Sequence, residues 1–257
     1  MSYIWLSEHH KDPQVRKEAL ILTLRDEDMV TKKLSGFSLE QHLSQEQNPE
    51  VRAAIIAQLP RSVKYQNKVL EHLKAHSQEA PVIIASLYFL SGAQETQDFI
   101  SLAESYLDHE NPEVARAALH GIMRHDGPAG LGDERAIHLV RHNPHPYVRQ
   151  VAAGLVPNTP EGNAILREVF TAAQDVEVKA EMASELLGRG AGDEALVSFL
   201  FREFEHHGEL GRNIKLGLTP QTLPMYQKVF SELDLFPLTQ GLIRQEIRAF
   251  ELKHRSD

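Results

Sequence analysis

Residues Gln47 to Leu59 read QNPEVRAAIIAQL, and residues Glu110 to Ile122 read ENPEVARAALHGI. Both stretches place Asn-Pro-Glu-Val before an alanine-rich apolar run. Asparagine is a favoured helix N-cap, and proline is tolerated at the first helical position, where no backbone N–H is needed. Each stretch therefore predicts a helix that begins at its proline, and the recurrence indicates that the chain contains a repeat.

Further copies of this motif extend the repeat along the chain. When the copies are aligned on their valine, successive valines lie 36, 31, 32, 34 and 30 residues apart. A period of this size is typical of solenoids built from pairs of helices. The aligned residues are Val15, Val51, Val82, Val114, Val148 and Val178.

The positions four, five and eight residues after each valine are mostly apolar, which places them on one buried face of a helix. Other amphipathic stretches separate these motif helices, so each repeat is predicted to be a helix A, a turn and a helix B. The sequence has no alternating strand pattern, and the predicted fold class is therefore all-α. The intervening stretches are 62–76, 96–107, 133–142, 160–173 and 193–206.

The pattern Asp/Asn-Pro-x-Val-Arg followed by alanines and leucines resembles the HEAT repeat, in the short bacterial form called PBS-lyase-like. The arginine of the pattern is present as Arg16, Arg52 and Arg149, and Ala115, Ile83 and Lys179 replace it elsewhere. In the resembling family, side chains at this position bond neighbouring repeats. The resemblance implies a right-handed α-α superhelix, a HEAT/ARM-like solenoid of about six to eight helical hairpins.

We expect residues 1–257 to form a single domain, with regular repeats over about 1–190 and degenerate repeats plus a C-terminal cap over about 191–257. The stretch FPLTQGLIRQEIRAFELKHR, residues 236–255, predicts a last helix with Thr239 as its N-cap. Leu242, Ile243, Ile247 and Phe250 are predicted to form its buried face. Its arginines and lysine suit a solvated outer side, as a terminal repeat requires.

Composition excludes several classes of function. The chain has no cysteine, which excludes disulfides, thiolate catalysis and cysteine-ligated zinc. Its formal net charge of -9 opposes non-specific attraction to nucleic acid. It has neither a long apolar run nor the start of a secretory signal, so we expect no membrane insertion and a cytoplasmic location.

A candidate binding surface lies opposite the buried face of the repeat, at the positions three, six and ten residues after the valine. In solenoids of this kind the B helices line the concave surface, and we expect a basic and aromatic strip there that binds a protein or an acidic peptide. Alternatively, arginines near a helix C-terminus only offset the helix dipole. The strip comprises Ile21, Arg25, Arg61, Tyr88, His120 and Arg124, with Arg189 one place later than the spacing requires.

We expect no cofactor, metal ion or catalytic residue. The 14 histidines show no His-Glu-x-x-His spacing, and His109-Glu110 is a single copy of a pair that HEAT-like di-iron hydroxylases need several times. The glycine-rich loop DGPAGLGDE, Asp126 to Glu134, lacks the lysine and the strand of a phosphate-binding loop and is predicted to end in an Asp133 cap.

The leading functional hypothesis is a non-catalytic scaffold or adaptor that binds a partner protein on the concave face of the solenoid. Two alternatives share the repeat: a subunit of a bilin lyase or isomerase, and a HEAT-like alkylpurine DNA glycosylase. The glycosylase hypothesis requires a basic, aromatic-lined groove, whereas this chain is acidic and has Trp5 as its one tryptophan.

Overall fold

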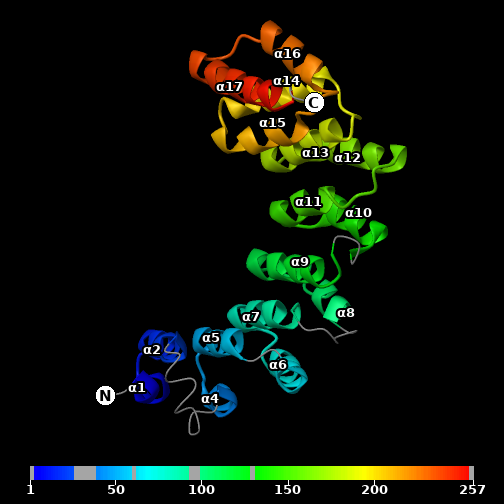
Figure 1. The fold of residues 1–257 in the computed structure, drawn as a ribbon. Coiled ribbons are helices and arrows are strands. Elements are labelled where there is room, and N and C mark those ends of the chain that lie inside the picture. The colour runs from blue at the N-terminus through cyan, green and yellow to red at the C-terminus, as the bar shows by residue number, and fades with distance from the viewer. Residues whose placement is uncertain (1–2, 26–38, 60–61, 93–98, 128–130, 255–257) are drawn as a thin grey trace. The chain divides into compact units, whose positions relative to one another are not determined.

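A computed structural model describes residues 3–25, 39–59, 62–92, 99–127 and 131–254. Over these residues it contains sixteen α-helices and one short 3-10 helix, and the described part of the chain has no β-strand (Figure 1). The all-α prediction is therefore confirmed. The chain divides into two compact units, Met1–Leu131 and Gly132–Asp257. A single domain over residues 1–257 stays a prediction.

Unit 1 contains two kinds of helix, the motif helices and the helices between them. The motif helices are α2 (Pro13–Arg25), α5 (Pro49–Gln58), α7 (Ala80–Leu90) and α9 (Pro112–Asp126). The others are α1 (Tyr3–His9), α4 (Leu39–Gln45), α6 (Val63–Ala75) and α8 (Phe99–Glu104). The motif helices pack in chain order, α2 on α5, α5 on α7 and α7 on α9, and form one layer of the unit (Figure 1).

Each motif helix of unit 1 also packs against the helix that precedes it in the chain: α1 on α2, α4 on α5, α6 on α7 and α8 on α9. The motif helix is the second helix of its hairpin, helix B, because the short turn that carries the motif closes the hairpin with the helix before it.

Unit 2 repeats this two-layer arrangement. Its helices are α10 (Asp133–His142), α11 (Pro146–Ala153), α12 (Pro160–Ala172), α13 (Val176–Gly188), α14 (Glu194–Phe204), η2 (Gly208–Leu210), α15 (Gly211–Gly217), α16 (Leu223–Glu232) and α17 (Pro237–Lys253). One layer runs α11, α13, α15, and the other includes α10 on α12 and α14 on α16. The last helix, α17, packs on α16.

The helix starts follow the capping chemistry that the motif predicts. The Asn48 side chain accepts hydrogen bonds from the backbone N–H groups of Glu50 and Val51, at 3.0 and 3.2 Å. Asn111 accepts from Glu113 N–H at 2.9 Å, and Asp12 accepts from Gln14 N–H at 2.9 Å. These bonds satisfy N–H groups that have no partner within the helix, and the predicted N-caps are confirmed.

The predicted apolar face of the motif helices is buried in both units. Every residue predicted at the fourth, fifth and eighth positions is nearly inaccessible to solvent, including Thr23, whose hydroxyl donates to the Ala19 carbonyl at 2.8 Å. The confirmed set is Ala19, Leu20, Thr23, Ile55, Ile56, Leu59, Ala118, Leu119, Ile122, Ala152, Ala153 and Val156. Close helix packing follows from the small alanine side chains at these positions.

Two predicted caps are wrong. Helix α10 begins at Asp133 with Gly132 as its N-cap, and Gly132 has a φ of 71° that favours glycine. Helix α17 begins at Pro237, so Thr239 is a buried residue inside the helix and not its cap. Gly132, with its positive φ, precedes the first turn of α10, and Pro237, whose ring fixes φ, is the first residue of α17. Asp133 and Thr239 therefore lie inside their helices.

We predict that Asn111→Ala lowers the free energy of unfolding by about 1 kcal/mol, because the N–H of Glu113 loses its acceptor. Urea denaturation followed by circular dichroism measures this change. Ser62, the N-cap residue of α6, makes no side-chain capping bond, so Ser62→Ala is the matched control and leaves the midpoint nearly unchanged. Equal effects of the two substitutions would contradict the capping role of Asn111.

Candidate functional site

Partly buried ion pairs join the N-terminal ends of neighbouring motif helices in unit 1. The Arg16 guanidinium of α2 donates to both carboxylate oxygens of Glu46, from Nε at 2.9 Å and from Nη2 at 2.8 Å. Its Nη1 donates to the carbonyls of His10 and Lys11 in the turn before α2. Because Glu46 lies in the turn before α5, this bridge holds the N-terminal ends of α2 and α5 together.

The arginine of the next repeat makes an equivalent bridge. Arg52 lies 3.3 Å from the carboxylate of Glu79, the N-cap residue of α7, and donates to the carbonyl of Gln47 in its own turn. The ring of His76 joins the group, with its Nδ1 3.1 Å from Glu79. Arg16 and Arg52 thus bond the neighbouring repeat, whereas Arg149 donates to the Val140 carbonyl within its own hairpin at 2.9 Å.

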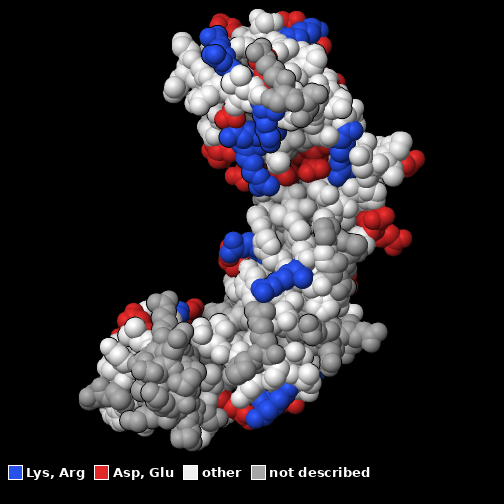
Figure 2. All heavy atoms as spheres, in the orientation of Figure 1, with Lys and Arg blue, Asp and Glu red and all other residues white. Residues whose placement is uncertain are grey.

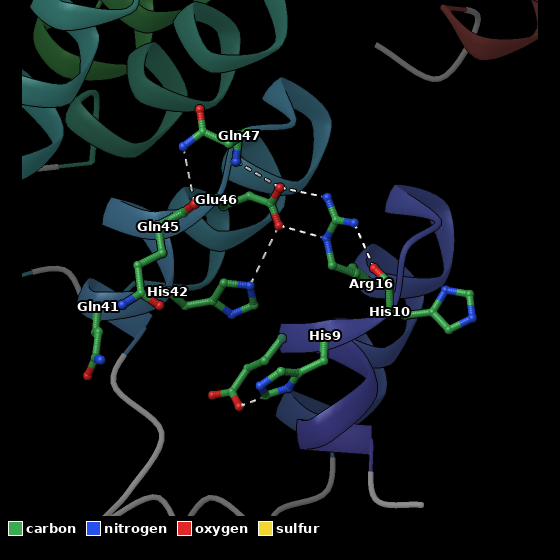
Figure 3. A pocket seen from close by; sticks show the side chains of 9 residues that line it. His9, His10, Arg16, Gln41, His42, Gln45, Glu46 and Gln47 are labelled. Carbon is green, nitrogen blue, oxygen red and sulfur yellow. Dashed lines mark hydrogen bonds and ion pairs between the residues drawn. The ribbon is translucent and has the colours of Figure 1, made fainter.

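A cavity of about 600 Å³ opens beside the Arg16–Glu46 bridge (Figure 3). Residues of α1 and α4 and the turn before α5 line it, and His42 lies with its Nε2 3.8 Å from Glu46. The Glu46 carboxylate also accepts hydrogen bonds from the backbone N–H groups of Gln47 and Asn48, at 2.9 and 2.8 Å. The charged groups of this cavity therefore already bond one another and the backbone.

The electrostatics of the cavity agree with a structural role for Glu46 and Arg16. Burial by itself would raise the pKa of Glu46, but hydrogen bonds from Arg16 and from backbone N–H groups outweigh burial and lower that pKa. The hydrogen bond to Glu46 raises the pKa of Arg16. Burial lowers the pKa of His42, despite the nearby Glu46 carboxylate. A carboxylate held ionised by this many donors is a poor general base.

A second cavity, of about 580 Å³, lies between α4 and α6 and contains His72 in its lining. The ring of His72 lies 4.3 Å from that of His76. Burial, with a smaller contribution from the neighbouring His76 and Arg52, lowers the pKa of His72 to about 4. This imidazole is therefore neutral in the folded protein near pH 7.

The predicted binding strip lies on the motif helices, which are the B helices of the hairpins. Ile21 on α2 and His120 on α9 are half-buried, Tyr88 on α7 is 37% exposed, and Arg124 on α9 is exposed. Arg25 is the last residue of α2, but its side chain lies outside the described part of the structure, and all of Arg61 does too. Figure 2 shows the basic side chains of this view of unit 1 in separate patches.

Arg189 does not belong to such a strip. Its side chain is buried and donates to the carbonyls of Ala153 and Pro157, at 2.9 and 3.2 Å, at the end of α11. It also pairs with Glu185 one turn earlier at 3.2 Å. Arg189 therefore donates to carbonyls at a helix end and has a structural role. The sequence analysis offered such a role at helix C-termini as the alternative to binding.

The exposed side of the motif layer in unit 1 carries more apolar surface than the sequence predicted. Leu22, one residue after Ile21, is 45% exposed, and Ala57 on α5 is exposed at the position equivalent to Tyr88. We call Ile21, Leu22, Ala57, Tyr88 and His120 the motif-helix face. Leu22 lies seven residues after Val15, at the edge of the predicted buried face, and the equivalent residues Phe89 and Gly121 are buried in later repeats. The repeat spacing therefore did not predict that Leu22 is exposed.

The histidines and the glycine-rich loop are the remaining motifs that the sequence singles out. Within the described ranges, no group of three or more His, Asp or Glu side chains is placed to hold a metal ion. The glycine-rich loop has Gly127 and Gly132 at positive φ, 69° and 71°, and its residues 128–130 lie outside the described part. These glycines give the loop the sharp turns that it needs between α9 and α10.

No described helix is long and apolar enough to span a lipid bilayer. Comparison with protein-family models, with curated proteins and with solved structures finds no match to this chain. The resemblance to HEAT repeats thus rests on the sequence motif, and function has to be inferred from the surfaces described above.

We predict that Glu46→Gln lowers the free energy of unfolding at pH 7 by about 3 kcal/mol, because the guanidinium of Arg16 loses its buried charge partner. Because its pKa is lowered in the folded protein, ionised Glu46 stabilises the fold above its ordinary pKa of 4.5. This stabilisation is lost as the pH falls through the lowered pKa. The difference between wild type and variant therefore shrinks as the pH falls.

Urea denaturation at pH 7 and pH 4 measures both effects. Glu50→Gln removes an exposed carboxylate paired with Lys17 and is the matched control, with a cost below about 1 kcal/mol. A Glu46→Gln variant as stable as the control would show that the Arg16–Glu46 bridge does not hold the two repeats together.

We predict that stability falls as the pH decreases from about 6.5 to about 4, partly because of His72. The unfolded chain binds a proton on this residue near its ordinary pKa of 6.5, whereas the folded protein resists protonation until about pH 4. Replacing this group by His72→Gln flattens the pH dependence of the unfolding free energy. Parallel curves for variant and wild type would contradict the lowered pKa.

Proposed function

We propose that this protein is a non-catalytic helical-repeat scaffold that binds a partner protein or an acidic peptide through the motif-helix face of unit 1. In this proposal the hairpins form a HEAT-like solenoid, and the motif-helix face lies on its concave side. The observation that carries the proposal is the exposure of Leu22 on α2, Ala57 on α5 and Tyr88 on α7, because α2 packs on α5 and α5 packs on α7.

The composition of this face supports a protein partner. Tyrosine, leucine and small alanines provide apolar area with little conformational entropy to lose, and tyrosine is enriched among residues that dominate binding energy. Arg124 is exposed at the C-terminal end of α9, where it suits an acidic group on the partner. The bilin lyase and glycosylase alternatives stay hypotheses. The charged groups in the cavity beside the Arg16–Glu46 bridge bond one another and give neither alternative particular support.

A photocrosslinking experiment tests the proposal in the cells that produce the protein. The photoreactive residue benzoylphenylalanine replaces Ala57, which is exposed between α2 and α7, and adducts are identified by mass spectrometry. We expect one reproducible protein adduct, whose purified partner then serves for affinity measurements. Tyr88→Glu weakens that affinity at least tenfold, or by about 1.4 kcal/mol, because it places a charge in an apolar contact.

Tyr147→Glu is the matched control, since Tyr147 on α11 is 38% exposed and lies in unit 2. It leaves the affinity unchanged. If the adduct forms equally well with Tyr88→Glu, or if both tyrosine variants weaken binding equally, the motif-helix face is not the binding surface. For an acidic partner, Arg61→Glu combined with Arg124→Glu weakens capture while the helicity measured by circular dichroism is retained.

A further inference from the structure

The outer side of α17 carries an apolar stripe that the folded chain does not use. Leu238 is 77% exposed, Leu242 is 43% exposed and Leu252 is 57% exposed, and Gln245 and Ala249 between them are exposed too. These five residues, which we call the α17 seam, are separated alternately by four and three residues. This spacing is the heptad pattern with which one helix packs along another.

The seam points away from the neighbours of α17 within unit 2. The opposite side of the helix buries Ile243 and Ile247. On one flank Glu246 pairs with Lys215 of α15 at 3.1 Å, and on the other Arg244 stacks over the ring of Phe230 in α16, 5.7 Å from its centre. The prediction that Leu242 belongs to the buried face is therefore wrong, whereas Arg244, Arg248 and Lys253 are exposed as predicted.

The fully exposed charged residues beside the seam are basic, whereas Glu246 and Glu251 are half-buried. Arg248 is exposed next to the seam, Lys253 is exposed near its end, and Lys215 offsets the carboxylate of Glu246. Figure 2 shows lysine and arginine side chains gathered over α15, whose Lys215 pairs with Glu246 of α17. An apolar seam with basic flanks is unusual in a chain whose formal net charge is -9.

These charges decide between two kinds of helix that the seam could accept. In a parallel pair with a second copy of the chain, Arg248 would lie near Lys253 of the other copy. In an antiparallel pair about a two-fold axis, the same flank of the two helices would come together. Near the middle of the seam, Arg248 would then approach Arg248 of the other copy, and Glu246 would approach Glu246. A helix with acidic residues beside its own apolar seam avoids this repulsion and gains attraction instead.

We propose that the α17 seam binds an amphipathic α-helix of another protein, one with apolar residues in heptad spacing and with acidic residues beside them. This surface is separate from the motif-helix face, and the proposal holds or fails independently of the proposed function. Exposed leucines provide the apolar contact, and the arginine flank selects the charge of the partner.

The test uses the full chain and two synthetic peptides of three heptads, labelled with a fluorophore. Both peptides have leucine at the seam positions; one has glutamate at the flanking positions and the other has lysine. We expect fluorescence anisotropy to report binding of the glutamate peptide and at least tenfold weaker binding of the lysine peptide. Leu242→Glu weakens binding of the glutamate peptide at least tenfold, and Arg248→Glu weakens it at least threefold.

Val63→Glu is the matched control, because Val63 on α6 is 51% exposed but lies in unit 1, outside the motif-helix face. It leaves peptide binding unchanged, and circular dichroism verifies that all variants fold. Equal binding of both peptides, or no loss with Leu242→Glu, overturns the proposal. It is also overturned by a dimer in analytical ultracentrifugation that Leu242→Glu abolishes, or by Leu242-dependent binding to anionic vesicles without peptide binding.

Discussion

The burial of a broad apolar face on each motif helix is the constraint on which the rest of the structure depends. Residues such as Leu20, Ile55 and Leu119 are fully buried, and the helix that precedes each motif helix covers only part of this face. The remainder is covered by the motif helix of the next repeat, because α2, α5, α7 and α9 pack on one another in order. A single hairpin would leave this surface in water, so the hairpins are stable as neighbours.

The polar chemistry of the repeat is concentrated at the N-terminal ends of the motif helices, where it sets their alignment. Asn48 caps its helix, and the nearby Arg16–Glu46 bridge joins that helix end to the previous repeat. A weaker link of the same kind connects Lys17 to Glu50 at 3.0 Å, and in unit 2 Gln150 bonds Glu177 at 3.1 Å at equivalent positions. Because these groups bond one another, they hold neighbouring repeats together at the N-terminal ends of the motif helices.

The two surfaces that we propose for binding arise in different ways. The motif-helix face belongs to a packed layer, so it presents partly or fully exposed side chains from several helices at once. The α17 seam belongs to one helix at the edge of unit 2, whose inner side alone is buried. The first surface suits an extended partner that crosses helices, whereas the second suits one helix lying along another.

The sequence by itself determined where most motif helices begin and which of their faces is buried, because capping and the 3.6-residue period act over only a few residues. It did not determine that the motif helix closes a hairpin with the helix before it, or that Arg189 bonds the end of α11 while Arg124 stays exposed. It also assigned Leu242 to the core, whereas Ile243 and Ile247 occupy that side of α17. Only the tertiary structure decided these points, because amphipathic helices with apolar residues on two sides can bury either one, and contacts distant in the sequence select which side is covered.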